Sequence, residues 1–364
     1  MNGNTGDVAY QTFRETRYFG SLNGIRCICI FLVLWHHSPL YTDLIEPPQI
    51  LRRGFSGVDF FFVLSGFLIT SLLIREEQAQ GRFSLKGFYR RRILRIVPVY
   101  FLVVTLVAIW WIGVRGQDQW WGLLPYYYLF LANFLNSDIP LLAPMWSLSV
   151  EEQYYLIWPL VLLLLPMKNM LRMAVALIFI SVAFCVGMGV LPELIIFPAT
   201  ELATFRLPMA GYSALLLGAV GALILHTPLG FRWAWGYLNH TLTPAILFTA
   251  LLLAWQFLPP VLLGWPNLVM HSLMLLIIVA VSIREDNGLA GPLSWRPVAR
   301  IGEVSYGIYL WHLIGLHFAT EFTEATNTSV LGSGLSNFVI YVGLSIAIAE
   351  LSYRFFESYF LKMK

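Results

Sequence analysis

Arg26 and His37 are ionisable residues within one apolar segment of this 364-residue chain. They are 11 residues apart, close to three helical turns, so in a helix both point to one side, about 16 Å apart along the axis. His36 points roughly 100° away from His37. A guanidinium binds anions and an imidazole can act as a base near neutral pH, so the pair predicts a polar stripe suited to proton transfer beside an anionic ligand. The alternative places Arg26 at one lipid headgroup layer and the histidines at the opposite interface.

Carboxylates open two further apolar segments. Asp59 lies near the start of the run 57–74, where it could accept a proton from one imidazole nitrogen and leave the other as a base. It could instead be a helix-start residue that faces water. Glu151 and Glu152 begin another segment. Because neighbouring helical residues point about 100° apart, we expect one of them to contact the site and the other to be structural.

Four arginines lie within the six residues 90–95. Arg91, Arg92 and Arg95 share one helical face by their i,i+3 and i,i+4 spacing. Guanidinium forks suit phosphate, so this face predicts a site for a polyphosphate ligand on the same membrane side as Arg26. An anchor on anionic membrane lipid is the alternative.

The composition excludes a soluble protein. Mean hydropathy is +0.70, and charged residues make up 12% of the chain, about half the usual share in soluble domains. A net charge of +3 leaves no large basic face for nucleic acid. No Cys/His pair among Cys27, Cys29, Cys185 and the histidines has zinc-site spacing, so we expect no metal.

The fold class predicted is an all-α polytopic membrane protein, with a polar cytoplasmic tail at 1–18 and a single membrane domain at 19–364. If the aromatic segment 120–135 does not cross the membrane, 18 of the 23 Lys and Arg residues lie on one side, which identifies that side as the cytoplasm. We therefore predict ten spans with both termini cytoplasmic. The spans are 22–38, 57–74, 96–114, 146–166, 173–191, 209–225, 242–258, 268–283, 304–318 and 338–353.

Other polar or small residues in these segments carry weaker signals. His271, His312 and His317 have no carboxylate nearby in sequence within a span, so we expect packing or interface roles for them. Small residues recur at every fourth position along 214–222, which indicates close helix packing.

Taken together, these motifs resemble the acyltransferase-3 family of integral membrane O-acyltransferases. The resemblance covers most of the chain from about residue 18, and the combination is highly specific although each motif alone is not. The motifs are the Arg-x10-His helix from Arg26 to His37, which selects His37 over His36, the run GVDFFFVLSGFLI at 57–69, the R-x-x-R of Arg92 and Arg95, the run WSLSVEEQ at 146–153, and SYGIYLWH at 305–312.

The resemblance implies transfer of an acyl group, commonly acetyl, from cytoplasmic acetyl-CoA or another acyl-CoA. The acceptor is a hydroxyl of a cell-surface polysaccharide such as an exopolysaccharide, of a lipid-linked sugar, or of a similar molecule, at a bacterial cytoplasmic (inner) membrane. It also implies that His37 is the catalytic histidine and that Arg26, Arg92 and Arg95 bind the donor. Since only 354–364 follow the last predicted span, we expect a stand-alone form without the SGNH hydrolase-like domain of some members.

We expect neutral His37 to remove the proton of the acceptor hydroxyl, with Asp59 holding its tautomer. Arg26 would bind donor phosphate or steady the oxyanion, and an acyl-histidine intermediate is an alternative route. One rival hypothesis is an MBOAT-like lipid or protein acyltransferase that uses a buried histidine such as His271 or His312. Another is a non-enzymatic carrier, although the paired repeats common in carriers are missing from the sequence.

Overall fold

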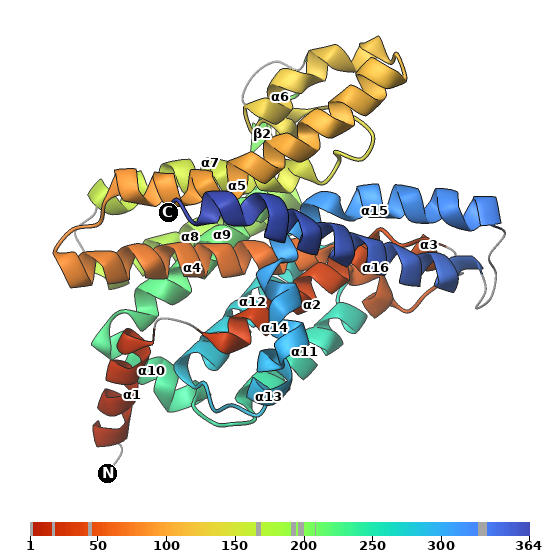
Figure 1. Cartoon of the computed structure of the whole chain (residues 1–364). Coiled ribbons are helices and arrows are strands. Elements are labelled where there is room, and N and C mark those ends of the chain that lie inside the picture. The colour runs from red at the N-terminus through yellow and green to blue at the C-terminus, as the bar shows by residue number, and fades with distance from the viewer. Residues whose placement is uncertain are drawn as a thin grey trace.

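The protein is almost entirely helical (Figure 1). The computed structural model describes residues 3–16, 19–42, 46–164, 169–190, 194–195, 200–207, 209–326 and 333–364. The long helices are α2 (Gly20–His36), α4 (Ser56–Gln80), α5 (Leu85–Ala108), α7 (Met145–Leu164), α8 (Met170–Val190), α9 (Met209–Leu225), α11 (Thr243–Phe257), α12 (Trp265–Ile283), α15 (Ser305–Thr326) and α16 (Ser333–Ser352).

Short elements connect the long helices. They are α1 (Gly3–Glu15), α3 (Pro39–Thr42), α6 (Leu124–Tyr128), α10 (Pro228–Leu238), α13 (Ala290–Ser294), α14 (Arg296–Glu303) and α17 (Ser358–Leu361). Two residues each form the antiparallel strands β1 (Leu194–Ile195) and β2 (Arg206–Leu207), with Leu194 opposite Leu207.

Each of the ten predicted spans overlaps one long helix, so the helical class is confirmed. Within the described residues, four helices are long and apolar enough to cross a membrane, or up to six if each of two bent pairs forms one span. A count of ten spans therefore stays a prediction. The four are Ser56–Gln80, Leu85–Val114, Trp265–Ile283 and Gly334–Leu361, and the pairs are Gly6–Glu15 with Gly20–His36 and Gly211–Leu225 with Pro228–Leu238.

The aromatic segment 120–135 forms no long helix. It is divided among the 3₁₀ turn Asp118–Leu123, the five-residue helix α6 and the 3₁₀ turn Ala132–Phe134. A membrane crossing needs about 20 helical residues. The segment therefore does not form a spanning helix, as the charge count predicted.

Within the predicted polar tail at 1–18, residues 3–15 form helix α1, which packs against the bundle, and the cytoplasmic placement of this tail stays a prediction. Phe13 of α1 is buried, and its ring centroid lies 5.4 Å from that of Phe231 in α10. The Tyr10 hydroxyl donates to the backbone oxygen of His226 at 3.0 Å. Arg75, near the end of α4, donates to the backbone oxygen of Phe13 at 3.0 Å. Apolar burial and these hydrogen bonds hold α1 against the bundle.

Buried apolar side chains form two clusters. The first fills the space among α1, α2, α4, α8, α9 and α12, and the second lies among the His37 end of α2, α5, the start of α7, α15 and α16. Val58, Phe61 and Tyr306 pack against both clusters. These three side chains therefore mark the boundary at which the candidate site lies.

Helices α4 and α9 approach so closely that glycine is needed at their contact. A Cβ atom on Gly66 would lie 1.9 Å from the backbone oxygen of Leu215, and one on Gly218 would lie 2.0 Å from that of Val63. The close packing predicted from the small residues at 214–222 is confirmed. This contact fixes α4, which carries one wall of the site.

Candidate active site

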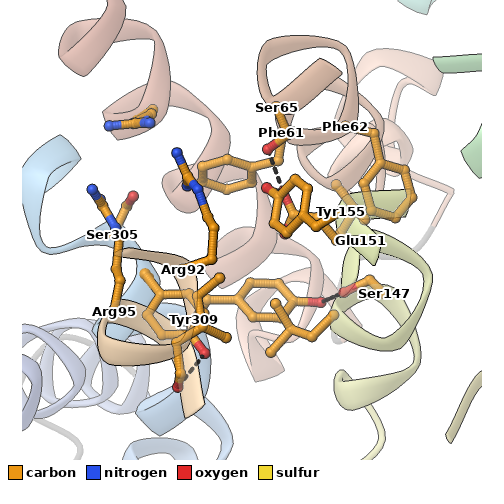
Figure 2. A pocket seen from close by; sticks show the side chains of 15 residues that line it. Phe61, Phe62, Ser65, Arg92, Arg95, Ser147, Glu151, Tyr155, Ser305 and Tyr309 are labelled. Atoms are coloured by element: carbon orange, nitrogen blue, oxygen red, sulfur yellow. Dashed lines mark hydrogen bonds between the residues drawn. The ribbon is translucent and has the colours of Figure 1, made fainter. Parts of the chain in front are cut away.

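A cavity of about 90 Å³ lies at the boundary of the two clusters and adjoins a wider one of about 590 Å³. Figure 2 shows the smaller cavity, with Arg92 and Arg95 of α5 extending in the same direction and Glu151 of α7 on the opposite wall. Both cavities share Ser65 of α4 and Tyr155 of α7 in their walls. Side chains from several helices therefore build one continuous polar region.

Three arginines give this region its positive charge. Arg26, Arg92 and Arg95 line both cavities and are half-buried. Arg26 donates to the Asn23 side-chain oxygen at 3.3 Å, and the Arg92 guanidinium lies 5.6 Å from the centre of the Tyr155 ring. Among the described residues, none of the three arginines forms a salt bridge. Partly buried cations without a paired carboxylate are costly in an apolar protein, so the region is suited to a polyanionic ligand.

The two adjacent glutamates of α7 lie in different surroundings. Glu151 accepts short hydrogen bonds from Ser65 and Tyr155 and lines the smaller cavity. Glu152 does not line this cavity, although it interacts electrostatically with Arg92, which does. The placement agrees with the prediction that only one of the two acids faces the site.

Arg91 does not join the other arginines, contrary to the predicted common face. Its Nη2 atom lies 2.6 Å from Glu76 Oε2, and its side chain is 47% exposed. Arg91 and Glu76 line a neighbouring cavity of about 340 Å³, whose wall also contains Arg92, but Arg91 does not line the two cavities of the site. A carboxylate on the preceding helix thus neutralises Arg91, which leaves Arg92 and Arg95 as the R-x-x-R pair of the site.

His37 lies at the end of α2 and is not among the lining residues of the arginine cavities. Its Nδ1 atom lies 3.0 Å from the backbone oxygen of Val33. A carbonyl oxygen only accepts hydrogen bonds, so Nδ1 carries the proton and Nε2 has the free lone pair of a base. The backbone therefore selects the tautomer that the sequence interpretation assigned to Asp59.

Asp59 pairs with a different histidine. Its Oδ1 atom lies 3.8 Å from Nε2 of His271, which is fully buried in α12. The prediction that Asp59 orients His37 is therefore wrong. We expected a packing or interface role for His271 because no carboxylate is near it in sequence, and the fold brings Asp59 beside it. A partner on a helix more than two hundred residues away gives no local sequence signal.

Sequence reasoning also missed Tyr309 and Ser147. The Tyr309 hydroxyl lies 2.6 Å from Ser147 Oγ, and both residues line the smaller cavity. They connect α15 with the start of α7. The signal in the sequence was their position in the motifs SYGIYLWH and WSLSVEEQ.

A fourth cavity, of about 210 Å³, continues from Arg95 and Tyr306 toward Lys364. Partial burial, together with the positive charges of Arg95 and Arg92, lowers the pKa of Lys364 to about 8. An anion bound near Arg95 would therefore also meet a lysine whose charge changes just above neutral pH.

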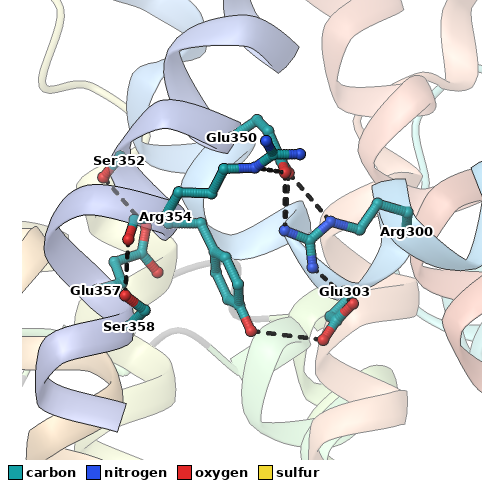
Figure 3. Close-up of polar contacts among 8 residues, drawn as sticks. Arg300, Glu303, Glu350, Ser352, Arg354, Glu357 and Ser358 are labelled. Atoms are coloured by element: carbon teal, nitrogen blue, oxygen red, sulfur yellow. Dashed lines mark hydrogen bonds and ion pairs between the residues drawn. The ribbon is translucent and has the colours of Figure 1, made fainter. Parts of the chain in front are cut away.

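Two other arginines near this cavity, Arg300 and Arg354, are paired with carboxylates (Figure 3). Arg300 of α14 binds Glu350 of α16 through Nη2 at 2.9 Å and Glu303 through Nη1 at 2.8 Å. Arg354 Nε lies 2.5 Å from the other oxygen of Glu350. This network joins α14 to α16, and the paired cations in it are not available to an anionic ligand, unlike those of the main cavity.

The fold and the site define a polytopic helical membrane protein with a cavity lined by arginines. The chain belongs to the acyltransferase family, whose acyltransferase domain matches residues 19–354.

Several curated relatives cover nearly the whole chain. The putative peptidoglycan O-acetyltransferase YrhL of Bacillus subtilis is 29% identical over 376 residues, which are 96% of this chain and 56% of the relative. The peptidoglycan O-acetyltransferase OatA of Listeria monocytogenes is 29% identical over 96% of this chain and 57% of its own length. A putative O-acetyltransferase of Staphylococcus aureus, SACOL0978, is 25% identical over 97% of this chain and 59% of its own. The chain thus spans less than two thirds of the length of these relatives, and no solved structure matches it.

Proposed function

We propose that this chain is a membrane O-acetyltransferase that moves an acetyl group from acyl-CoA to a hydroxyl of a cell-surface glycan. The proposal depends most on three arginines, Arg26, Arg92 and Arg95, which line a cavity of about 590 Å³ and form no salt bridge with any residue that the structure describes. Coenzyme A carries several phosphate charges, and guanidinium groups bind phosphate with charge-assisted, often bidentate, hydrogen bonds. The names of the relatives support peptidoglycan as the first acceptor to test.

We propose that the chain crosses a bacterial membrane ten times and has both termini in the cytoplasm. Acyl-CoA is made inside the cell, so the arginine cavity must open to that side. The bias of basic residues supports this orientation, because 18 of the 23 Lys and Arg residues then face the cytoplasm.

In the proposed reaction, the two ends of α2 have different roles. Arg26 and His37 are 11 residues apart, which corresponds to about 16 Å along the helix. Donor phosphates held at Arg26, Arg92 and Arg95 would leave the thioester arm to extend through the narrow cavity toward His37. His37 Nε2 then removes the hydroxyl proton of the acceptor while the oxygen attacks the thioester carbonyl. The carbon–sulfur bond breaks, and the sulfur leaves as the thiol of CoA after it gains a proton.

Mass spectrometry of cell-wall fragments tests the proposed function. A strain that lacks the chromosomal copy is complemented with the wild-type chain, with His37→Ala, or with His240→Ala. His240 is exposed between α10 and α11 and serves as a matched histidine control. We expect glycan fragments with the added acetyl mass only for the wild-type chain and His240→Ala. Wild-type acetylation by His37→Ala, at equal protein amounts, would rule out the proposed base.

A further inference from the structure

His312 of α15 lies directly beside His37, although the sequence suggested only a packing role. The two ring centroids are 4.9 Å apart, and the ring planes meet at 65°. The His312 side chain is fully buried. His36 also lies next to His37, with 5.1 Å between the ring centroids. His36 is the last residue of α2.

Backbone hydrogen bonds fix the same tautomer in both rings. Nδ1 of His312 lies 2.6 Å from the backbone oxygen of Tyr309, and Nδ1 of His37 lies 3.0 Å from that of Val33. Each Nδ1 therefore donates, and each Nε2 holds a lone pair in the neutral ring. Nε2 of His312 is buried and has no hydrogen-bond partner among the described residues. An unpaired buried nitrogen costs about 1–3 kcal/mol, so its presence calls for a functional explanation.

The position of His312 links His37 to the cavity. The ring of Tyr309, one helical turn earlier, lies 5.5 Å from that of His312. The Tyr309 hydroxyl donates to the backbone oxygen of Pro144 at 3.0 Å and also contacts Ser147, and it lines the smaller cavity. His312 thus stands between the base and the cavity in which the CoA sulfur would be released.

We propose that His312 is the proton partner of His37 in acetyl transfer, an inference that rests on the proposed function. His37 Nε2 takes the proton from the acceptor hydroxyl as the new oxygen–carbon bond forms. His37 passes this proton to the free Nε2 of His312, and His312 delivers it to the sulfur as the carbon–sulfur bond breaks. One proton moves from hydroxyl to thiol, and both imidazoles return to the neutral state.

The variant His312→Asn separates this role from a structural one. An asparagine amide nitrogen occupies nearly the position of Nδ1, so it keeps the hydrogen bond to Tyr309 but removes Nε2. We expect kcat to fall by about 10²-fold or more, the scale of general acid–base catalysis. The KM for acetyl-CoA should stay within about twofold, because donor binding does not involve His312. Wild-type kcat in His312→Asn would overturn the proposal.

A second variant keeps the test decisive if the asparagine protein folds poorly. His312→Ala leaves space for free imidazole, which should restore part of the lost turnover in purified protein. A failure of imidazole to restore turnover would count against the proposal. His317→Ala, on the same helix and beside Glu321, is the matched control and should keep wild-type kcat.

The outcomes distinguish this inference from the proposed function. If the wild-type protein transfers no acetyl group, or His37→Ala stays active, the proposed function itself fails. If His37→Ala is inactive while His312→Asn is fully active, only the role of His312 is refuted.

Discussion

Arg91 and Arg92 are adjacent in sequence but lie in different surroundings, and the proposed donor site uses Arg92 alone of the two. Arg92 lines the arginine cavity and forms no salt bridge among the described residues, whereas Arg91 is paired with Glu76 at 2.6 Å and lies outside that cavity. Replacing each with glutamine removes one positive charge and keeps a polar side chain of similar length. The pair of variants therefore tests position rather than net charge.

The expected magnitudes follow from these surroundings. A hydrogen bond to a charged group contributes about 1.5–3 kcal/mol, so Arg92→Gln should weaken CoA binding by about 10-fold to 150-fold at 1.36 kcal/mol per tenfold change. An exposed salt bridge such as that of Arg91 with Glu76 contributes about 0–1 kcal/mol to stability. Arg91→Gln should therefore leave the Kd for CoA within about threefold of the wild type, since only screened long-range attraction is lost.

Isothermal titration of CoA into detergent-solubilised protein at low and moderate salt measures both values. Equal losses of affinity in Arg91→Gln and Arg92→Gln would refute the assignment of the donor site to the Arg92 cavity. They would support a diffuse basic surface instead.

Three further predictions concern the same region and its support. Lys364 has a pKa of about 8, and bound phosphate favours its charged form. CoA affinity should therefore be full below pH 8 and fall by at most about tenfold per pH unit above it. Lys364→Arg should flatten that slope in a titration series, and an unchanged slope would contradict a role of Lys364 in CoA binding. Glu151→Gln keeps the acceptor for Ser65 but removes a negative charge near the arginines, so the Kd for CoA should decrease by a few-fold, and weaker binding would speak against the charge argument. Gly66→Ala would place a Cβ 1.9 Å from a backbone oxygen of α9 and should destabilise the protein by about 1–3 kcal/mol in thermal unfolding, whereas Gly236→Ala, which meets open space, should not lower Tm.

The sequence predicts the helices well because apolar runs about 20 residues long are a local property. Helical spacing places Arg91, Arg92 and Arg95 on one face, and the family resemblance implies that Arg26, Arg92 and Arg95 bind the donor. Composition alone does not fix the number of membrane crossings, because some apolar helices, such as α11 (Thr243–Phe257), are shorter than a span needs.

Pairings between distant helices account for the incorrect site predictions. Asp59 has a buried partner in His271 of α12, and His37 faces His312 of α15. Arg91 has the right helical spacing, but Glu76 at the end of α4 captures it. Each of these pairs depends on how the helices pack, and the residue pattern along one helix does not show which residues of another helix it will contact.

The most direct test of acetyl transfer uses purified protein in vesicles, with radiolabelled acetyl-CoA supplied to the side that carries Arg92 and a soluble glycan fragment as acceptor. The account predicts label in ester linkage on the acceptor and one free CoA thiol for each acetyl group transferred, with neither product formed by His37→Ala. Label transfer by His37→Ala at the wild-type rate, or acceptor that stays unlabelled while the wild-type protein binds CoA, would contradict it.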